Sequence, residues 1–421
     1  MHDIKFIREN PQEFDKQLDR KGFPATATKI IELDSEFRLL QTKLDELRTK
    51  KNQIAKQIGQ AKANKQDASD LFKQAEIVKK QISEIEDSGD KELKDLLLTL
   101  PNLANPQVPS GTSENDNIEI KKWGEPKEFD FKPKQHFEIG DKIGLDFEQS
   151  AKISGARFST FTGDLAKLAR ALQNFMLDLH TTEHGFTEIH TPSLVKAEAL
   201  IGTGQLPKFE EDLFKTTDGR YLISTSEISV TNMVAGKLLK EQDLPIRYAC
   251  YGRCFRSEAG SAGKDTRGII RQHEFSKVEL VSIVKSEDSE KEHQKILQSA
   301  EAVLQKLVLP YRIVDLCTGD LGFSSARTFD IEVWLAGQNS YREISSVSNF
   351  RDFQARRMKT RYKDLQGKNQ FTNTLNGSGV ALERLIVAIL ENYQQKDGSI
   401  KIPEVLINYM SGVTEIGNSK V

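Results

Sequence analysis

The chain has 421 residues, of which 37% are hydrophobic and 29% are charged, and its formal net charge is −2. This length allows two or three domains that each bury a core. The near-neutral charge excludes a uniformly basic nucleic-acid-binding surface, so a polyanion would have to be bound by local patches. Three cysteines without a CxxC pair argue against a zinc site and a disulfide framework. With no signal peptide and no run of about 18 apolar residues, we expect a soluble cytoplasmic protein without a membrane span.

Residues 30–100 predict a long helical arm within an N-terminal domain of residues 1–103. Apolar side chains recur at steps of four and three residues along two seams separated by a polar segment at 59–70. The first seam comprises Leu33, Phe37, Leu40, Leu44, Leu47, Lys51, Ile54, Ile58 and Ala61. The second comprises Leu71, Ala75, Val78, Ile82, Ile85, Leu93, Leu96 and Leu100, with a slip at Ser88-Gly89. Two such seams joined by a turn predict an antiparallel α-helical coiled coil.

The first seam's helix also carries a basic run between residues 43 and 65. Its members are Lys43, Arg48, Lys50, Lys51, Lys56, Lys62 and Lys65, against Asp45 and Glu46, whereas residues 66–95 carry more acid than base. The ordinary interpretation is a solvated coiled-coil face. The alternative is a surface that follows a phosphate backbone, because Lys and Arg contacts supply most of the affinity for nucleic acids.

Residues 104–421 predict a second domain of α+β type, preceded by an irregular linker at about 104–135. The linker contains several prolines and one predicted strand at 117–123. Further strands are predicted at 186–190, 222–223, 246–255, 275–284, 311–314, 329–335 and 341–344. Helices are predicted at 165–179, 286–307, 350–362 and 379–393. Strands arranged in hairpins, with helices set apart, predict a mostly antiparallel β-sheet with flanking helices.

Strands 246–255 and 275–284 predict a long hairpin on which charged residues gather. Arg256, Glu258, Arg271 and Glu279 stand at alternating positions, which would place them on one face of the sheet. The plain alternative is a solvated face with cross-strand ion pairs.

The chain has no P-loop and no GxGxxG turn between a strand and a helix, so a bound nucleotide would have to be held by side chains. Arg256 could form a bidentate contact with an α-phosphate or a carboxylate, and Arg271 could bind terminal phosphates. Phe275 offers a stacking face for a base, and Arg384, near the start of the last predicted helix, could cover its other side.

Several strings together resemble a known family. Phe255-Arg256-Ser257-Glu258 resembles motif 2 of class II aminoacyl-tRNA synthetases, the segment ending at Pro192 resembles motif 1, and residues 379–384 resemble motif 3. The longer strings GTGQLPKF (202–209), FRSEAGSAGKDTRGIIRQHEF (255–275), DFQARR (352–357), TLNGSG (374–379) and ENYQQKDGSIKIPEVL (391–406) are similar to those of bacterial-type seryl-tRNA synthetases. The similarity spans the whole chain, including the arm.

This resemblance implies that the chain ligates L-serine to tRNA(Ser) through a seryl-adenylate made from ATP, with tRNA(Sec) as a second candidate substrate. It implies a serine pocket formed by Thr225, Glu227, Arg256, Glu279, Asn376 and Ser378. Thr225 and Glu227 would hold the serine ammonium, and Glu279 would accept a hydrogen bond from the serine hydroxyl. Such a site rejects alanine because its polar groups would be left unpaired.

The resemblance also implies an ATP site formed by Arg256, Glu258, Arg271, Phe275, Glu343, Ser346 and Arg384. Catalysis would depend on Arg256, Glu258 and Arg384. Glu258 would bind the adenine amino group, and Phe275 and Arg384 would sandwich the ring. Glu343 and Ser346 would hold Mg²⁺ or Mn²⁺ through oxygen ligands.

The family further implies a homodimer formed through motif 1, with tRNA bound across subunits. In that picture the tRNA contacts of the arm would be Arg48, Lys50, Lys51, Lys56, Lys62 and Lys65. Ser224, Val347 and Phe350 depart from the family pattern, but none of them is a proposed ligand. Two rival functions stay open: an enzyme that loads an amino acid onto a carrier protein, and a catalytically silent nucleic-acid-binding or interaction module.

Overall fold

The computed structural model describes residues 1–88, 91–260, 263, 265 and 267–417. The chain divides into two compact units, His2–Leu100 and Pro101–Val421, the second of which includes Met1. The helices of the first unit are α1 (Ile4–Glu9), α2 (Pro11–Asp19), α3 (Ala27–Ala63), α4 (Ser69–Ser88) and α5 (Lys91–Thr99). Those of the second are α6 (His136–Gly140), α7 (Glu148–Ser154), α8 (Gly163–Thr182), α9 (Ala197–Thr203), α10 (Glu227–Thr231), α11 (Ser289–Lys306), α12 (Phe353–Met358) and α13 (Leu382–Tyr393).

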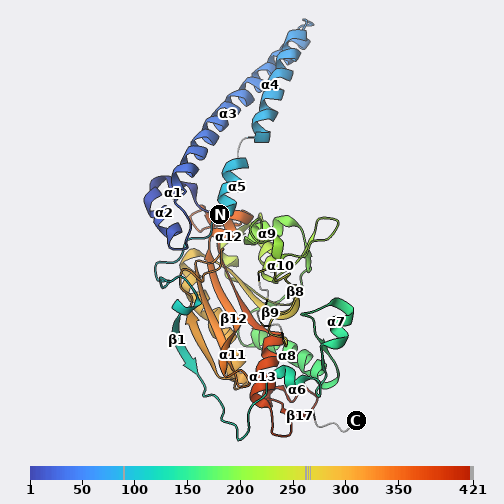
Figure 1. Cartoon of the computed structure of the whole chain (residues 1–421). Helices are drawn as coiled ribbons and strands as arrows, with labels where there is room; N and C mark the ends of the chain where they lie inside the picture. Colours follow the sequence, from blue (N-terminus) through green and yellow to red (C-terminus); the bar gives the residue numbers. More distant parts are fainter. Residues whose placement is uncertain (89–90, 261–262, 264, 266, 418–421) are drawn as a thin grey trace. The chain divides into compact units, whose positions relative to one another are not determined.

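The predicted helical arm is confirmed: α3 and α4 run side by side in opposite directions (Figure 1). Their contact is made by the two predicted seams. The buried side chains are Leu44, Ile54, Val78, Ile82 and Ile85, flanked by Leu40, Leu47, Ile58, Leu71 and Ala75. Burial of these apolar side chains stabilises helices whose outer faces are polar.

Two details of the arm differ from the prediction. The turn is shorter than 59–70, because α3 continues through Gly59 to Ala63. In α5 the side chain of Leu97 is buried together with Leu93, whereas Leu96 is only half-buried. A step of four residues from Leu93 reaches the same helix face. The predicted slip at Ser88-Gly89 falls partly outside the described residues.

The second unit is built on a sheet of eight strands, ordered β1-β10-β11-β12-β15-β9-β8-β4. These strands are β1 (Ile118–Trp123), β4 (Thr187–Glu188), β8 (Ile246–Phe255), β9 (Glu274–Val284), β10 (Tyr311–Asp315), β11 (Arg327–Leu335), β12 (Ser340–Arg351) and β15 (Asn373–Ala381). All neighbours in this sheet are antiparallel except β4 and β8. The predicted α+β class with a mostly antiparallel sheet is therefore confirmed.

Short strands form the smaller sheets of this unit. They are β2 (Leu145–Asp146), β3 (Thr160–Phe161), β5 (Leu194–Val195), β6 (Tyr221–Leu222), β7 (Leu238–Lys240), β13 (Arg361–Lys363), β14 (Asn369–Phe371), β16 (Ile400–Lys401) and β17 (Glu415–Ile416). Within the described ranges, no helix combines the length and the apolar character that crossing a membrane would require.

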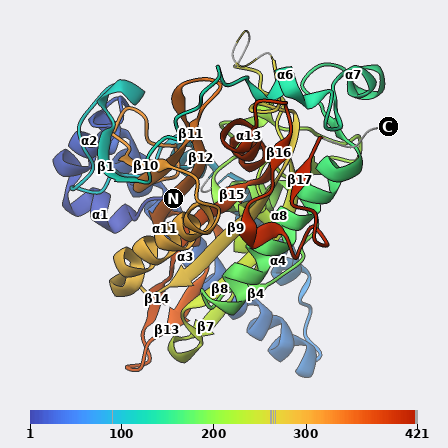
Figure 2. The same ribbon diagram turned by 90° about the horizontal axis from the view of Figure 1, so that it is seen from below.

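One face of the main sheet is apolar and is covered by α8, α11 and α13 (Figures 1 and 2). Alternate residues of β9, such as Val278 and Leu280, point into this core and are fully buried. The intervening residues point to the opposite face, because successive side chains of a strand alternate. Val281 and Ile283 on that face pack against α10, and Lys277 and Glu279 of the same face are polar.

Three predicted elements differ from the structure for identifiable reasons. β12 is longer than the predicted strand 341–344, because its polar residues beyond Ile344 line the open face of the sheet. The predicted helix at 350–362 is only α12, since Arg351 and Lys359 adopt left-handed backbone conformations (φ 52° and 59°) that flank it. The last helix begins at Leu382 rather than 379, because β15 continues to Ala381.

Candidate active site

The hairpin of β8 and β9 provides the floor of the site. Across the pair, Cys254 stands opposite Phe275, Gly252 opposite Lys277, and Cys250 opposite Glu279. Phe275, Lys277 and Glu279 therefore share the polar face of the sheet. The prediction that Arg256, Glu258, Arg271 and Glu279 all occupy alternating strand positions was wrong for three of them. Only Glu279 lies within a strand, because β8 ends at Phe255 and β9 begins at Glu274.

The residues beyond the strand ends nevertheless converge on one cavity of about 220 Å³. It is lined by Arg256, Glu258, Ile269, Ile270, Arg271, Gln272, Phe275, Lys277, Glu343, Ile344, Ser378, Ala381, Glu383 and Arg384. The Arg256 guanidinium lies 5.0 Å from the centre of the Phe275 ring. Arg271 donates to Glu258 at 2.6 Å, and Glu258 itself adopts a left-handed backbone conformation (φ 56°). The cavity thus combines an aromatic face with fixed cations.

Arg384 enters this cavity from the first turn of α13. Its side chain donates to the carbonyl oxygens of Ile270 (3.3 Å) and Glu343 (2.7 Å), and it also forms a 3.2 Å ion pair with the Glu343 carboxylate. The Arg384 charge lowers the pKa of Glu343. Arg384 and Phe275 both line the cavity, but the guanidinium that lies over Phe275 is that of Arg256.

A group of oxygen donors lies beside Glu343. Asp330 stands opposite Ser346 in the pairing of β11 with β12, and one oxygen of its carboxylate is buried without a hydrogen-bond partner among the described residues. Burial and the nearby Glu343 charge raise the pKa of Asp330 well above its ordinary value. No cluster of three His, Cys, Asp or Glu side chains suited to a metal is found in the part of the chain that the structure describes. Glu343 and Ser346 do fit Mg²⁺, which is commonly held by one or two carboxylates together with substrate phosphates.

A second group of polar residues surrounds the carboxylate of Glu279, which is fully buried. Thr225 Oγ1 donates to one of its oxygens at 3.1 Å, and Asn376 Nδ2 donates to the other at 3.0 Å. Lys277 forms an ion pair with Glu279 and also donates to Ser378 Oγ at 3.4 Å. The paired, hydrogen-bonded donors offset the cost of burying this charge.

Glu227 lies next to this group and is also buried. It accepts a hydrogen bond from Gln354 Nε2 at 2.6 Å. Burial and the Glu279 charge raise the pKa of Glu227 to about 7. Thr225, Glu227 and Ser224 line a cavity of about 510 Å³ that shares Arg256, Glu258 and Arg271 with the first cavity. The two cavities therefore adjoin at Arg256.

Besides Asp330, three site residues were not predicted: Lys277, Gln354 and Glu383. Lys277 precedes Glu279 by two positions in the same strand, so the period of a strand could have identified it. Gln354 and Glu383 stand inside strings already noted, DFQARR and the motif 3 segment. Both oxygens of Glu383 accept from the Ser276 amide, at 3.0 and 2.9 Å, and burial raises the pKa of Glu383 to about 7. This bond ties the start of β9 to α13.

Close packing explains the two glycines of the string TLNGSG, Gly377 and Gly379. A Cβ on Gly377 would come within 2.5 Å of the Ile296 side chain of α11. A Cβ on Gly379 would come within 2.6 Å of His180, whose imidazole lies 3.2 Å from the Gly379 carbonyl oxygen. Burial lowers the pKa of His180 to about 3, so the ring is neutral. These close approaches hold Asn376 and Ser378 in place on the polar face.

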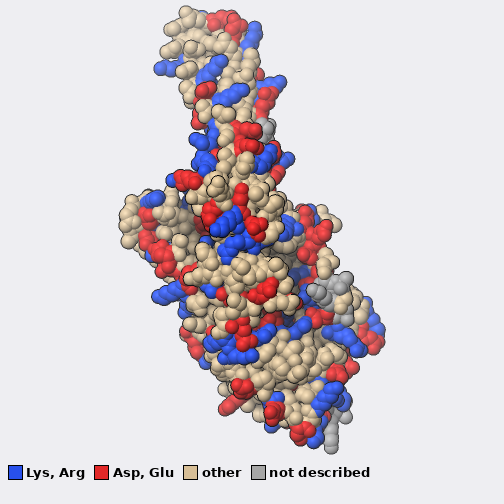
Figure 3. All heavy atoms as spheres, turned by 60° about the vertical axis from the view of Figure 1, so that its left-hand side comes forward, with Lys and Arg blue, Asp and Glu red and all other residues tan. Residues whose placement is uncertain are grey.

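On the arm, all seven residues of the basic run are exposed. Lys and Arg side chains are interspersed with acidic ones on the face seen in Figure 3. Arg48 forms a 2.8 Å ion pair with Glu86 of α4, and Lys62 lies over the Phe72 ring at 5.2 Å. The arm therefore presents a mixed surface, within which Lys50, Lys51, Lys56 and Lys65 project from or just beyond α3.

The whole chain is similar to known proteins. The family model for the seryl-tRNA synthetase N-terminal domain matches residues 1–104, and the model for the tRNA synthetase class II core domain (G, H, P, S and T) matches residues 208–393. The chain is 52% identical to the serine–tRNA ligase of Zymomonas mobilis and 51% identical to that of Brucella abortus, with 99% of each chain covered.

Solved structures agree with these matches. The seryl-tRNA synthetase from Pyrococcus horikoshii complexed with ATP is 38% identical, with a TM-score of 0.86 over 99% of both chains. The cytoplasmic serine–tRNA ligase from Naegleria fowleri in complex with AMP is 30% identical, with a TM-score of 0.84 over 99% of this chain and 98% of that one. Identity above 50% along the full length, together with the same fold, shows that the chain belongs to the seryl-tRNA synthetase family of class II enzymes.

Proposed function

We propose that the protein ligates L-serine to tRNA(Ser) in two ATP-dependent steps, with a seryl-adenylate as the intermediate. The observation that carries this proposal is the buried Glu279 carboxylate, ringed by Thr225, Asn376 and Lys277 beside a cavity of aromatic and cationic side chains. A carboxylate held in this way accepts a hydrogen bond from a small hydroxylated side chain. An apolar side chain of the same size would leave it without that bond.

In the first step Arg256 binds the serine carboxylate and then the α-phosphate, since it borders both cavities. Glu227, with Thr225, neutralises the serine ammonium. The serine carboxylate oxygen attacks the α-phosphorus, the bond to the β-phosphate oxygen breaks, and pyrophosphate leaves. The chain supplies no nucleophile, so its contribution is positioning and charge neutralisation.

The ATP contacts follow from the side chains of the first cavity. The adenine ring stacks on Phe275, which requires the Arg256 guanidinium to move from the ring towards the phosphates. Glu258 accepts a hydrogen bond from the adenine amino group, and Arg384 covers the ring's second face. Glu258 would then exchange its ion pair with Arg271 for the contact with adenine, and Glu343 would exchange its ion pair with Arg384 for the divalent cation.

Glu343 and Ser346 are the residues that would hold a divalent cation, Mg²⁺ or Mn²⁺. When bound, such an ion neutralises negative charge on the phosphates. Arg271, freed from Glu258, binds the outer phosphates alongside it. Asp330 stands opposite Ser346 on the neighbouring strand and places a further carboxylate beside this pair.

In the second step the terminal ribose hydroxyl of tRNA attacks the seryl carbonyl and AMP leaves. We propose that residues 1–103 form a tRNA-binding domain whose contacts include Arg48, Lys50, Lys51, Lys56, Lys62 and Lys65. Residues 104–421 form the catalytic domain. We further propose a homodimer through motif 1, where the outermost strand β4 ends the sheet, with tRNA bound across the subunits. tRNA(Sec) is a second candidate acceptor.

Pyrophosphate exchange between ATP and radiolabelled pyrophosphate, run separately with serine, threonine, alanine and glycine, tests the proposal. Exchange that depends on serine is expected, with tRNA(Ser) as the acceptor in the second step. Exchange without transfer to tRNA would instead favour loading of a carrier protein. Silence with all four amino acids would favour a non-catalytic module and refute the proposal.

A further inference from the structure

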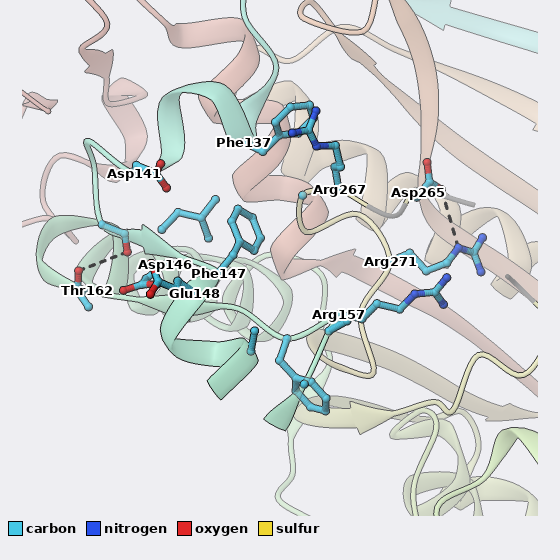
Figure 4. A pocket seen from close by; sticks show the side chains of 17 residues that line it. Phe137, Asp141, Asp146, Phe147, Glu148, Arg157, Thr162, Asp265, Arg267 and Arg271 are labelled. Atoms are coloured by element: carbon cyan, nitrogen blue, oxygen red, sulfur yellow. Dashed lines mark hydrogen bonds and ion pairs between the residues drawn. The ribbon is translucent and has the colours of Figure 1, made fainter. Parts of the chain in front are cut away.

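The returning limb of the hairpin, residues 267–271, lies outside the strands. Residues 269–271 line the cavity of about 220 Å³ proposed for ATP, the nucleotide cavity. On its other side the limb contacts α6, where the Arg267 guanidinium lies 5.3 Å from the centre of the Phe137 ring (Figure 4). Buried backbone groups of such a segment need hydrogen-bond partners from other elements. The shape of the nucleotide cavity therefore depends on the groups that hold this limb.

One of these groups is the imidazole of His136, the first residue of α6. The Ile269 amide donates to His136 Nε2 at 3.1 Å, and both residues are only 1% exposed. Gly268 allows this approach, because its backbone is left-handed (φ 84°) and a Cβ there would lie 2.0 Å from the same nitrogen. The contact between the limb and the imidazole is therefore buried and closely fitted.

The second nitrogen of this imidazole is held by a buried carboxylate. Because Nε2 accepts from Ile269, the proton of the neutral ring is on Nδ1, which donates to Glu391 at 2.9 Å. Glu391 is fully buried in the last turn of α13. It also accepts from the Gly337 amide at 3.0 Å and from Gln338 Nε2 at 3.1 Å. These donors fix the carboxylate, and the carboxylate fixes the orientation and tautomer of the His136 ring.

The neighbouring residue of the limb, Ile270, is held from the other end of the same helix. Its carbonyl oxygen accepts from Arg384 Nε at 3.3 Å, and Arg384 stands in the first turn of α13. Two consecutive residues of the limb are thus tied to the two ends of α13. Loss of the imidazole acceptor would leave the buried Ile269 amide unpaired and release one of these two ties.

We propose that His136 is a positioning residue for ATP binding, which holds residues 269–271 against the nucleotide cavity by accepting the hydrogen bond from Ile269. The inference rests on the proposed function, because ATP is the ligand proposed for that cavity. His136 itself lines neither the nucleotide cavity nor the cavity beside Glu227. Its effect should therefore fall on the KM for ATP, while the serine pocket, which is built by other elements, should keep its affinity.

Two substitutions separate the two hydrogen bonds of the imidazole. His136→Gln places an amide oxygen at the distance of Nε2 and keeps an acceptor for Ile269. His136→Asn places its amide at the distance of Nδ1, so it keeps a donor for Glu391 but leaves Ile269 without an acceptor. Tyr393→Phe is the matched control, because the Tyr393 hydroxyl donates to the Leu307 carbonyl oxygen at 2.7 Å from the same end of α13. The KM for ATP, the KM for serine and kcat are measured in pyrophosphate exchange, and Tm is measured for every variant.

We expect His136→Asn to raise the KM for ATP about tenfold, the order of effect that a buried amide without an acceptor produces. The KM for serine should stay within about twofold, and His136→Gln should bring the KM for ATP back to within about threefold of the unmodified protein. Gly268→Ala, which separates the limb from the imidazole on the other side, should also raise the KM for ATP. Tyr393→Phe should lower Tm and leave both KM values unchanged.

The same KM for ATP in His136→Asn and His136→Gln would overturn the inference, because the acceptor for Ile269 would then have no effect. An equal rise of the KM for serine in His136→Asn would also overturn it and would indicate a general loss of structure. Absence of serine-dependent exchange in the unmodified protein would refute the proposed function instead. Calorimetric titration with ATP would then still compare the two His136 variants.

Discussion

The arm and the serine pocket differ in how their contacts are distributed along the chain. The arm's seam joins two consecutive helices through apolar side chains, so each contact repeats the one before it. In the pocket, Glu279 contacts Thr225 and Asn376, which lie 54 and 97 positions away, and every contact is polar. Losing one apolar contact should therefore lower the stability of the arm only by the contribution of that contact. Losing one polar partner should leave buried hydrogen-bonding groups unpaired and change the chemistry of the pocket.

The sharpest test of this difference is Glu279→Ala. We expect the preference for serine over alanine, measured as the ratio of kcat/KM values in pyrophosphate exchange, to fall by about 10⁴-fold, because a site that pairs a substrate hydroxyl discriminates by that order. Lys277→Met is a companion variant that leaves the carboxylate but removes its cation. A preference that is unchanged in Glu279→Ala would remove Glu279 from the serine pocket.

On the arm, Ile54→Ala should cost roughly 2–4 kcal/mol of local stability, as large-to-small changes of buried aliphatic residues do. Ile54 is only 3% exposed and lies within the seam. Hydrogen exchange of the α3 and α4 amides should accelerate, while serine-dependent pyrophosphate exchange should stay unchanged. A loss of pyrophosphate exchange in Ile54→Ala would show that the arm's seam also supports the catalytic domain. The effect of an apolar contact would then not be confined to the arm.

The same contrast explains what the sequence could predict. The arm followed from spacing alone, because Leu44, Ile54 and Val78 repeat with the period of a helix whose neighbour is the next helix along the chain. The strands of the hairpin were also predicted within one residue, since β8 and β9 are rich in aromatic and β-branched residues. Local pattern was sufficient wherever the partner lay close in sequence.

The site could be predicted only through the family's motifs. Periodicity placed Arg256 and Glu258 on the strands, whereas β8 ends before them and they reach the cavity from the loop. The ion pairs Arg271–Glu258 and Arg384–Glu343 depend on how separate segments of the chain meet in the fold. The local periodicity of the sequence does not encode such contacts. The length of β12 was missed for a related reason: its polar residues face the site, so they interrupt the apolar pattern by which strands are recognised.

The basic run of the arm provides a smaller effect with a clear control. Replacing Lys50, Lys51 and Lys56 with alanine should weaken tRNA(Ser) binding about tenfold at moderate salt. It should also reduce the salt dependence of the affinity, because a protein that contacts fewer phosphates releases fewer counterions when it binds. Replacing the exposed lysines of α4, Lys73, Lys79 and Lys80, removes the same charge from the other helix. Equal weakening by the two triple variants would indicate a general charge effect and refute a specific surface on α3.

The pH dependence of serine binding should show the smallest and most graded effect. The pKa of Glu227 is raised from 4.5 to about 7, chiefly by burial and secondarily by Glu279. Below that pH the carboxyl becomes protonated and cannot neutralise the serine ammonium. The KM for serine in pyrophosphate exchange should therefore rise up to about tenfold for each pH unit below 7 and level off above it.

Glu227→Gln should raise the KM at pH 8 and abolish this slope, since glutamine does not titrate. Glu383 provides the control, because burial also raises the pKa of its carboxyl to about 7. Its carboxyl bonds the Ser276 amide and does not face the serine pocket. Glu383→Gln should keep the slope of KM with pH, whatever its effect on kcat. A slope that survives in Glu227→Gln but disappears in Glu383→Gln would assign the titration to the join between β9 and α13, and the ammonium would then need another partner.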